Sequence, residues 1–151
     1  MQPLKSDEMS SAAHIIASEC VAVRIRTLNR AITSLFDEAL RPLGLRVGQL
    51  NLLVTIARIG AARPSMICQA LQMDKSTLSR DISVLRRQGW LDSSDSKVRR
   101  GHLQLSPTGR DLLEKALPAW QRAQERASTL IGDQGVAILS RYADNLWSNT
   151  R

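Results

Sequence analysis

The chain has few residues of the kinds that form disulfides and metal sites. Its 151 residues include two cysteines and two histidines. Cys20 and Cys68 lie far apart in the sequence, and neither has a second thiol or a histidine cluster nearby, which argues against a disulfide framework and a zinc site. His14 and His102 are isolated as well. We therefore expect reduced thiols, no metal site and no cofactor.

The sequence also lacks membrane segments and catalytic motifs. No stretch approaches the roughly 18 apolar residues that a membrane span needs, and no charged, apolar, small-residue leader opens the chain. No nucleophile lies in a motif that also supplies a base and an oxyanion donor. We expect a soluble cytoplasmic protein that has no membrane partner and is not an enzyme.

Acidic residues are scarce relative to basic ones. The chain has 21 Lys and Arg against 14 Asp and Glu, a net charge of +7 and a pI of about 10.4. Residues 58–110 contain ten cations and four anions, so this third of the chain carries six of the seven excess positive charges. A basic segment of this kind favours a polyanionic partner.

Apolar residues recur every three or four positions through most of the chain, which is typical of amphipathic helices. The length fits one domain, residues 1–151. The first helix is predicted from about residue 11 to Gly44, where glycine accepts the left-handed conformation that closes a helix. A second helix follows over 47–59, and Ser65 is placed to cap the N-terminus of a third.

The fourth helix, Lys75–Gln88, has the clearest function. The carboxylate of Asp74 can accept a hydrogen bond from the amide of Thr77, and Gly89 lies where the helix must stop. Apolar residues of this helix and the preceding one fall at helical spacing and can bury one face, which leaves hydroxyls and cations outside. Two short helices joined by a tight turn, the second with such a polar face, indicate a helix-turn-helix that enters DNA.

The next segments are predicted to complete a winged helix-turn-helix over about 47–106. Trp90–Leu91 and Leu103–Leu105 read as two short strands with a polar, cation-rich tip between them. Ser106–Gly109 starts another long helix, and Asp133 caps a last one. The predicted fold is mainly α, with six helices and a small β-wing. The apolar terminal helices, about 11–44 and 107–149, are predicted to form the interface of a homodimer.

Three stretches resemble the MarR-type winged-helix transcriptional regulators. They are Leu43–Leu50, then Met73–Arg80 together with Leu85–Leu91, and finally Leu105–Gly109. The resemblance extends over about residues 15–148. It implies a homodimer whose two recognition helices enter successive major grooves of double-stranded DNA, at a near-palindromic operator with half-sites roughly 34 Å apart.

The predicted DNA contacts are the polar residues of the recognition helix and the cations of the wing. Candidates for base and phosphate contacts are Lys75, Ser76, Thr77, Ser79 and Arg80. Ser65 is a candidate phosphate anchor at a helix start. Arg86 is a further candidate, for which a solvated surface position is an equal alternative. The wing supplies Lys97, Arg99 and Arg100, and either Lys97 or Arg99 is the cation that enters the minor groove.

Three functional hypotheses stay open. The first is a sequence-specific repressor that a small aromatic or anionic effector releases, with Arg24 facing the ligand. The second is a thiol-based oxidant sensor that uses Cys20, as in the organic-hydroperoxide branch of the resembled family, although burial of Cys20 as a small apolar residue is the favoured interpretation. The third is a nonspecific architectural DNA-binding protein, which the specificity ratio at fixed salt would distinguish from the first.

Overall fold

The computed structural model describes residues 11–92 and 101–148. The described backbone is mainly helical, and it forms two compact units that divide between Ser34 and Leu35. Within the described residues, no helix is long and apolar enough to cross a membrane. The elements in chain order are α1 (Ser11–Glu19), α2 (Val21–Leu40), the 3-10 helix η1 (Arg41–Leu43), α3 (Val47–Ile59), α4 (Pro64–Leu71), α5 (Lys75–Arg87) and α6 (Pro107–Ser148).

The first unit contains α1 and most of α2. A single helix was expected here, but the helix is interrupted at Cys20. Backbone hydrogen bonds still pass through this position, because the Cys20 amide donates to the Ile16 carbonyl (3.0 Å) and the Arg24 amide donates to the Cys20 carbonyl (3.3 Å). The guanidinium of Arg24 also donates to the carbonyl of Ser18.

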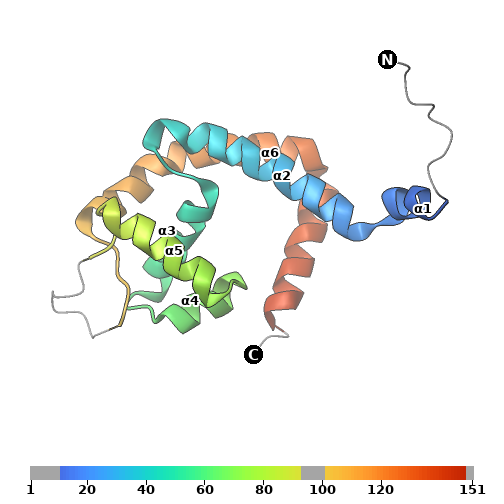
Figure 1. The fold of residues 1–151 in the computed structure, drawn as a ribbon. Helices are drawn as coiled ribbons and strands as arrows, with labels where there is room; N and C mark the ends of the chain where they lie inside the picture. The colour runs from blue at the N-terminus through green and yellow to red at the C-terminus, as the bar shows by residue number, and fades with distance from the viewer. Residues whose placement is uncertain (1–10, 93–100, 149–151) are drawn as a thin grey trace, which may run out of the picture. The chain divides into compact units, whose positions relative to one another are not determined.

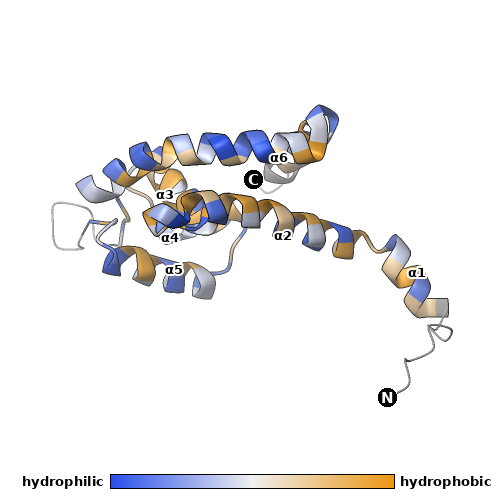
Figure 2. Ribbon diagram, turned by 90° about the horizontal axis from the view of Figure 1, so that it is seen from above, coloured by the Kyte–Doolittle hydropathy of each residue, from blue (hydrophilic) through white to orange (hydrophobic). Residues whose placement is uncertain are grey.

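The second unit has its core among α3, α4, α5 and the first part of α6, which lie together in Figure 1. The predicted helix over 47–59 matches α3. Gly44 has a φ of 65°, which confirms that the chain leaves the helical conformation there. The least exposed large side chains are all aliphatic: Leu40, Leu45, Leu52, Leu53, Ile56, Ile67, Leu78 and Leu85. Figure 2 shows hydrophobic and hydrophilic residues alternating along α5, as expected for a helix with one buried face.

The two predicted wing strands are replaced by isolated β-bridges in the described residues. Leu91 pairs with Leu105, but Leu103 pairs with Ala62, which precedes α4. The Ala62 and Leu103 amides each donate to the other residue's carbonyl, at 2.9 and 2.7 Å. Because the returning segment divides its hydrogen bonds between two partners, neither pairing is long enough to make a strand. The prediction of a two-strand wing was wrong in this detail.

The C-terminal helix α6 consists of two helical stretches that meet at one non-helical residue. Gly132 has a φ of 75° and a ψ of 160°, and the two halves of α6 meet there. This is the position where the sequence predicted one helix to end and another to begin at Asp133. The break at Gly132 therefore agrees with the prediction, whereas the break at Cys20 was not predicted and divides the expected first helix in two.

The start of α6 lies directly against the end of the recognition segment. The Ser106 amide donates to the Trp90 carbonyl (3.0 Å). A Cβ atom built on Gly109 would lie 2.1 Å from the same carbonyl oxygen. A residue larger than glycine at this position would therefore force the backbone of Trp90 away from the first turn of α6.

We expect Gly109→Ala to lower the free energy of unfolding by about 1–3 kcal/mol, because the added methyl group overlaps backbone atoms that have little room to move. Urea unfolding checks this value. The control is Gly48→Ala in α3, where the built Cβ meets nothing within 4 Å. That change is expected to raise stability by up to about 1 kcal/mol. Equal effects of the two substitutions would contradict the steric argument.

Candidate nucleic-acid interface

A tight turn connects α4 to α5. Gln72 ends α4 with a φ of 51°, a left-handed conformation that is uncommon for residues other than glycine. The Met73 amide donates to the Cys68 carbonyl (3.0 Å), and the Gln72 side-chain amide donates to the Gln69 carbonyl (3.1 Å). These bonds satisfy carbonyls at the end of α4 and direct the chain into α5, as in a helix-turn-helix.

Asp74 caps the N-terminus of α5, as the sequence predicted. Its Oδ1 accepts hydrogen bonds from the Thr77 amide (2.8 Å) and the Ser76 hydroxyl (2.6 Å). Its Oδ2 accepts a third from the Thr77 hydroxyl (2.8 Å). The hydrogen bonds from Ser76 and Thr77 hold the pKa of Asp74 well below its ordinary range. The Ser76 and Thr77 hydroxyls thus donate their hydrogen bonds within the cap. Their oxygens can still accept hydrogen bonds from a ligand.

The two faces of α5 differ in the way the sequence predicted. Leu78, Ile82 and Leu85 are buried. Lys75 and Arg80 are exposed on the same helix, and so is Ser79. Arg86 and Arg87 are exposed in the last turn. The helix therefore presents cations and hydroxyls to solvent from a base fixed by apolar packing, which is the arrangement needed to contact a nucleic acid.

Ser65 does not cap α4. The helix begins at Pro64, its N-cap residue is Arg63, and no side chain caps it. Proline suits the first helical position because its fixed φ is helical and its missing N–H would have no partner there, so the helix begins one residue earlier than a serine cap would allow. Ser65 is instead exposed within the first turn of α4.

The base of the wing is tied to the start of α4. In addition to the Ala62–Leu103 pairing, Nε of Arg63 donates to Nε2 of His102 (3.4 Å). The wing cations Lys97, Arg99 and Arg100 lie outside the described residues. Within the ranges 11–92 and 101–148, no group of three or more His, Cys, Asp or Glu could hold a metal ion.

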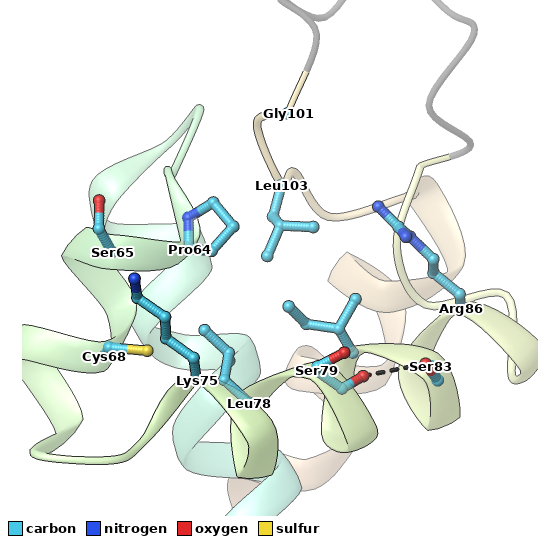
Figure 3. A pocket seen from close by; sticks show the side chains of 11 residues that line it. Pro64, Ser65, Cys68, Lys75, Leu78, Ser79, Ser83, Arg86, Gly101 and Leu103 are labelled. Carbon is cyan, nitrogen blue, oxygen red and sulfur yellow. Dashed lines mark hydrogen bonds between the residues drawn. The ribbon is translucent and has the colours of Figure 1, made fainter.

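A pocket of about 350 Å³ lies between α4, α5 and the base of the wing. Figure 3 shows Lys75 and Arg86 on opposite sides of it, with Leu103 between them. The remaining lining is mostly small hydroxyls, aliphatic side chains and one thiol: Pro64, Ser65, Cys68, Leu78, Ser79, Ile82, Ser83 and Gly101. Two cations beside an apolar floor suit a small anionic molecule that has an apolar body.

This pocket was not predicted from the sequence. Cys68 and Ser83 were not assigned a binding role, although Lys75, Ser79 and Ser83 recur every four residues and therefore lie along one side of α5. The other half of the pocket comes from α4 and from Gly101 and Leu103, which follow Ser83 by about 20 positions. Cys20 and Arg24, the candidates for redox or ligand binding, lie in the first unit, where Cys20 is half-buried and Arg24 is exposed.

Comparison with known proteins adds independent information. A model described as the MarR family matches residues 43–101. The structure of a cysteine-to-serine variant of MarR from Escherichia coli, complexed with operator DNA, is 18% identical with a TM-score of 0.74, over 87% of this chain and 96% of that one. The transcriptional regulator MosR of Mycobacterium tuberculosis is 27% identical with a TM-score of 0.67, over 84% and 97% of the two chains.

A third structure contains a small molecule. It is the Mycobacterium tuberculosis MarR family protein Rv2887 in complex with p-aminosalicylic acid, which is 16% identical with a TM-score of 0.63, over 83% of this chain and 97% of that one. No curated protein matches the chain in sequence. The structural matches extend over nearly the whole length of each of these proteins, so this chain shares their fold.

We expect Asp74→Ala to lower the melting temperature at neutral pH, because it leaves the first amides of α5 without their acceptor. Since the pKa of Asp74 is lowered in the folded protein, its contribution is complete above about pH 4 and decreases as the pH falls toward that lowered pKa. The difference between wild type and variant should therefore shrink on acidification. Thermal unfolding monitored by circular dichroism between about pH 3 and pH 7 measures it.

The control for this prediction is Asp74→Ser, which keeps a hydroxyl acceptor but carries no charge. Its melting temperature relative to Asp74→Ala should stay constant over the same pH range. A wild-type advantage over Asp74→Ala that does not change with pH would contradict a charged cap.

Proposed function

We propose, from the match of residues 43–101 to the MarR family and the fold shared with Escherichia coli MarR, that this chain is a MarR-type regulator and a homodimeric repressor that binds a near-palindromic operator in double-stranded DNA. In this proposal α5 is the recognition helix and enters the major groove. A small aromatic or anionic effector releases the protein from DNA.

The observation that supports the proposal is the amphipathic helix α5 with its capped N-terminus. Its inner face is fixed by Leu78, Ile82 and Leu85, and its outer face exposes Lys75 and Arg80. A guanidinium can grip the O6 and N7 atoms of guanine bidentately, so we assign base reading to Arg80. We assign phosphate contact to Lys75, because an ammonium group acts as a point charge.

The remaining predicted contacts belong to the same proposal. Ser76, Thr77 and Ser79 lie in the first two turns of α5, where hydroxyl oxygens can meet base edges or phosphates. Ser65 and Arg86 flank the same surface from α4 and from the end of α5. Lys97, Arg99 and Arg100 are assigned to minor-groove and phosphate contacts of the wing. The operator complex of Escherichia coli MarR supports DNA binding by a protein of this fold.

Exposed apolar residues on the terminal helices support the homodimer. In α6, the exposed residues include Trp120 with 38% and Leu130 with 61% of their surface accessible. A chain that stayed monomeric would keep these faces in water, whereas large exposed apolar patches usually mark an interface. We assign the interface to the segments 11–44 and 107–149. The exposed apolar residues there are Ile15, Ile16, Val21, Val23, Ile25, Leu28, Leu117, Trp120, Leu130, Ile138, Leu139 and Tyr142.

The pocket between α4, α5 and the wing base is the site that we propose for the effector. Because Lys75 and Arg86 lie on opposite sides of the pocket, a carboxylate can pair with either one, while Leu78 and Leu103 contact an aromatic ring. The complex of Rv2887 with p-aminosalicylic acid supports a ligand of this class. Because Lys75 and Ser79 line the pocket and are also assigned to DNA, effector and duplex would bind with opposed preferences.

Nonspecific architectural binding is the alternative function. It would depend on phosphate charge alone, so affinity would vary steeply with salt and little with sequence. Oxidant sensing through Cys20 has less support, because the half-buried Cys20 lies in a unit with few described polar contacts, and its neighbour Arg24 donates to a backbone carbonyl.

We expect Arg80→Ala to reduce the discrimination between operator and random duplex by about 1–3 kcal/mol at fixed salt, because it removes a base contact. Operator fragments selected from random DNA, followed by fluorescence anisotropy, provide the measurement. Arg122→Ala, an exposed cation in the middle of α6, makes the same charge change and should leave the discrimination intact. Light scattering checks that both variants keep the dimer mass. Equal losses on all sequences would favour the architectural function.

We expect p-aminosalicylate to raise the melting temperature of the protein and to weaken operator binding, because its carboxylate pairs with Arg86 in the pocket. Arg86→Ala should remove most of the ligand-induced shift. The matched control is Arg87→Ala, which changes the neighbouring exposed cation outside the pocket lining and should keep the shift. Equal shifts in the two variants would exclude this pocket as the effector site.

A further inference from the structure

We propose that Ser106 is a positioning residue that fixes the angle between α5 and α6 and thereby sets the half-site spacing that the dimer accepts. The second part of this inference rests on the proposed function. The first part concerns only the second unit of the chain and stands on its hydrogen bonds.

Ser106 serves two helices with one hydroxyl group. The side chain is buried, with 8% of the residue surface accessible. Its Oγ donates to the Gly89 carbonyl (2.6 Å), just past the end of α5. The same Oγ accepts from the Gly109 amide (3.0 Å) in the first turn of α6. One atom therefore bonds to a carbonyl just past the end of one helix and to an otherwise unpaired N–H group in the first turn of the other.

The segment that follows α5 is held on both sides. The Gly89 amide donates to the Arg86 carbonyl (2.9 Å), and the Trp90 amide donates to the Leu85 carbonyl (3.0 Å), so this segment follows the end of α5. The Gly89 and Trp90 carbonyls both accept from Ser106, the first from its hydroxyl and the second from its amide. Two consecutive carbonyls bound by one residue leave little freedom for rotation between the helices.

The other side of this joint is equally fixed to α6. The Arg110 amide donates to the Ser106 carbonyl (3.0 Å), and the Arg110 guanidinium donates to the Leu105 carbonyl (2.8 Å). The close approach of Gly109 to the Trp90 carbonyl prevents the first turn of α6 from moving inward. Directional hydrogen bonds through Ser106 thus fix the orientation of α6 relative to α5.

The contacts of α5 with its other neighbour are of a different kind. Buried aliphatic residues of α4 and α5, such as Ile67 and Leu78, pack without a preferred direction. If the Ser106 hydroxyl is removed, this packing keeps α5 folded, but the angle of α5 relative to α6 becomes less restricted. Since α6 carries exposed apolar faces assigned to the dimer, a looser angle would let the two recognition helices fit operators of several spacings.

The first measurement follows the joint itself, without DNA. In a background with Cys20→Ser and Cys68→Ser, spin labels are attached through Arg87→Cys on α5 and Arg122→Cys on α6, both exposed sites. Labelled protein is diluted with unlabelled protein so that only distances within one chain are read. We expect a narrow distribution for Ser106 and for Ser106→Thr, which keeps the hydroxyl, and a broader one for Ser106→Ala. An unchanged distribution in Ser106→Ala would overturn the proposal.

The second measurement follows operator spacing. Duplexes carry the two half-sites about ten base pairs apart, centre to centre, or with one or two base pairs added or removed. We expect Ser106→Ala to lose about fivefold in its preference for the best spacing, the net worth of one hydrogen bond, and Ser106→Thr to retain it. Ile56→Val in the core of α3 controls for lower stability and should keep the wild-type preference.

The outcomes separate the inference from the proposed function. Broadened distances with an unchanged spacing preference would overturn the role of Ser106 in operator choice. If the wild-type protein prefers no duplex over random DNA, the proposed function fails, while the label distances still decide whether Ser106 fixes the angle.

Discussion

The close contact between the Trp90 carbonyl and the first turn of α6 is the constraint on which the interface depends. Here the chain must leave one helix, form isolated β-bridges and enter the next helix within 20 residues. A glycine at position 109 allows the two backbones to approach, and Ser106 satisfies the polar groups that this approach buries. Without this contact, α5 would still pack against α4, but its angle relative to α6 would be less restricted.

The N-terminus of α5 shows how a negative charge can be useful in a basic surface. A carboxylate facing phosphates would weaken binding through repulsion. The charge of Asp74 is instead shared among three donors from Ser76 and Thr77, and the positive end of the helix dipole lies beside it. The adjacent Lys75 places a positive charge in the same turn. The cap thus orders the first turn while the outward surface keeps its basic character.

Features that depend on neighbours in sequence were predicted well. The bounds of α3, the cap by Asp74, and the backbone reversals at Gly44 and Gly89 all follow from local rules of spacing and capping. The assignment of Lys75 and Arg80 to the outer face of α5 also follows from helical period, and their exposure agrees with it. The DNA contacts themselves stay a prediction.

Features that depend on distant partners were not predicted. Ser65 is a local exception: serine is a residue type that caps helices, but the adjacent Pro64 starts the helix before it. Leu103 has the pattern of a strand, but its partner is Ala62 and not the segment after α5. The pocket needs α4, α5 and Gly101 to come together, and the double role of Ser106 needs Gly89 to lie beside it. No local pattern in the sequence contains these pairings.

The length of α6 gives its starting angle a large mechanical effect. From Pro107 to the residue before Gly132, the helix extends for about 37 Å at 1.5 Å per residue. Acting as a lever arm of this length, a tilt of about 5° at its origin displaces its far end by about 3 Å, close to the 3.4 Å rise of one base pair. A shift of one base pair would therefore correspond to a change of a few degrees in the angle at the start of α6. A pair of short hydrogen bonds can hold the angle this closely, whereas apolar contacts without a preferred direction cannot.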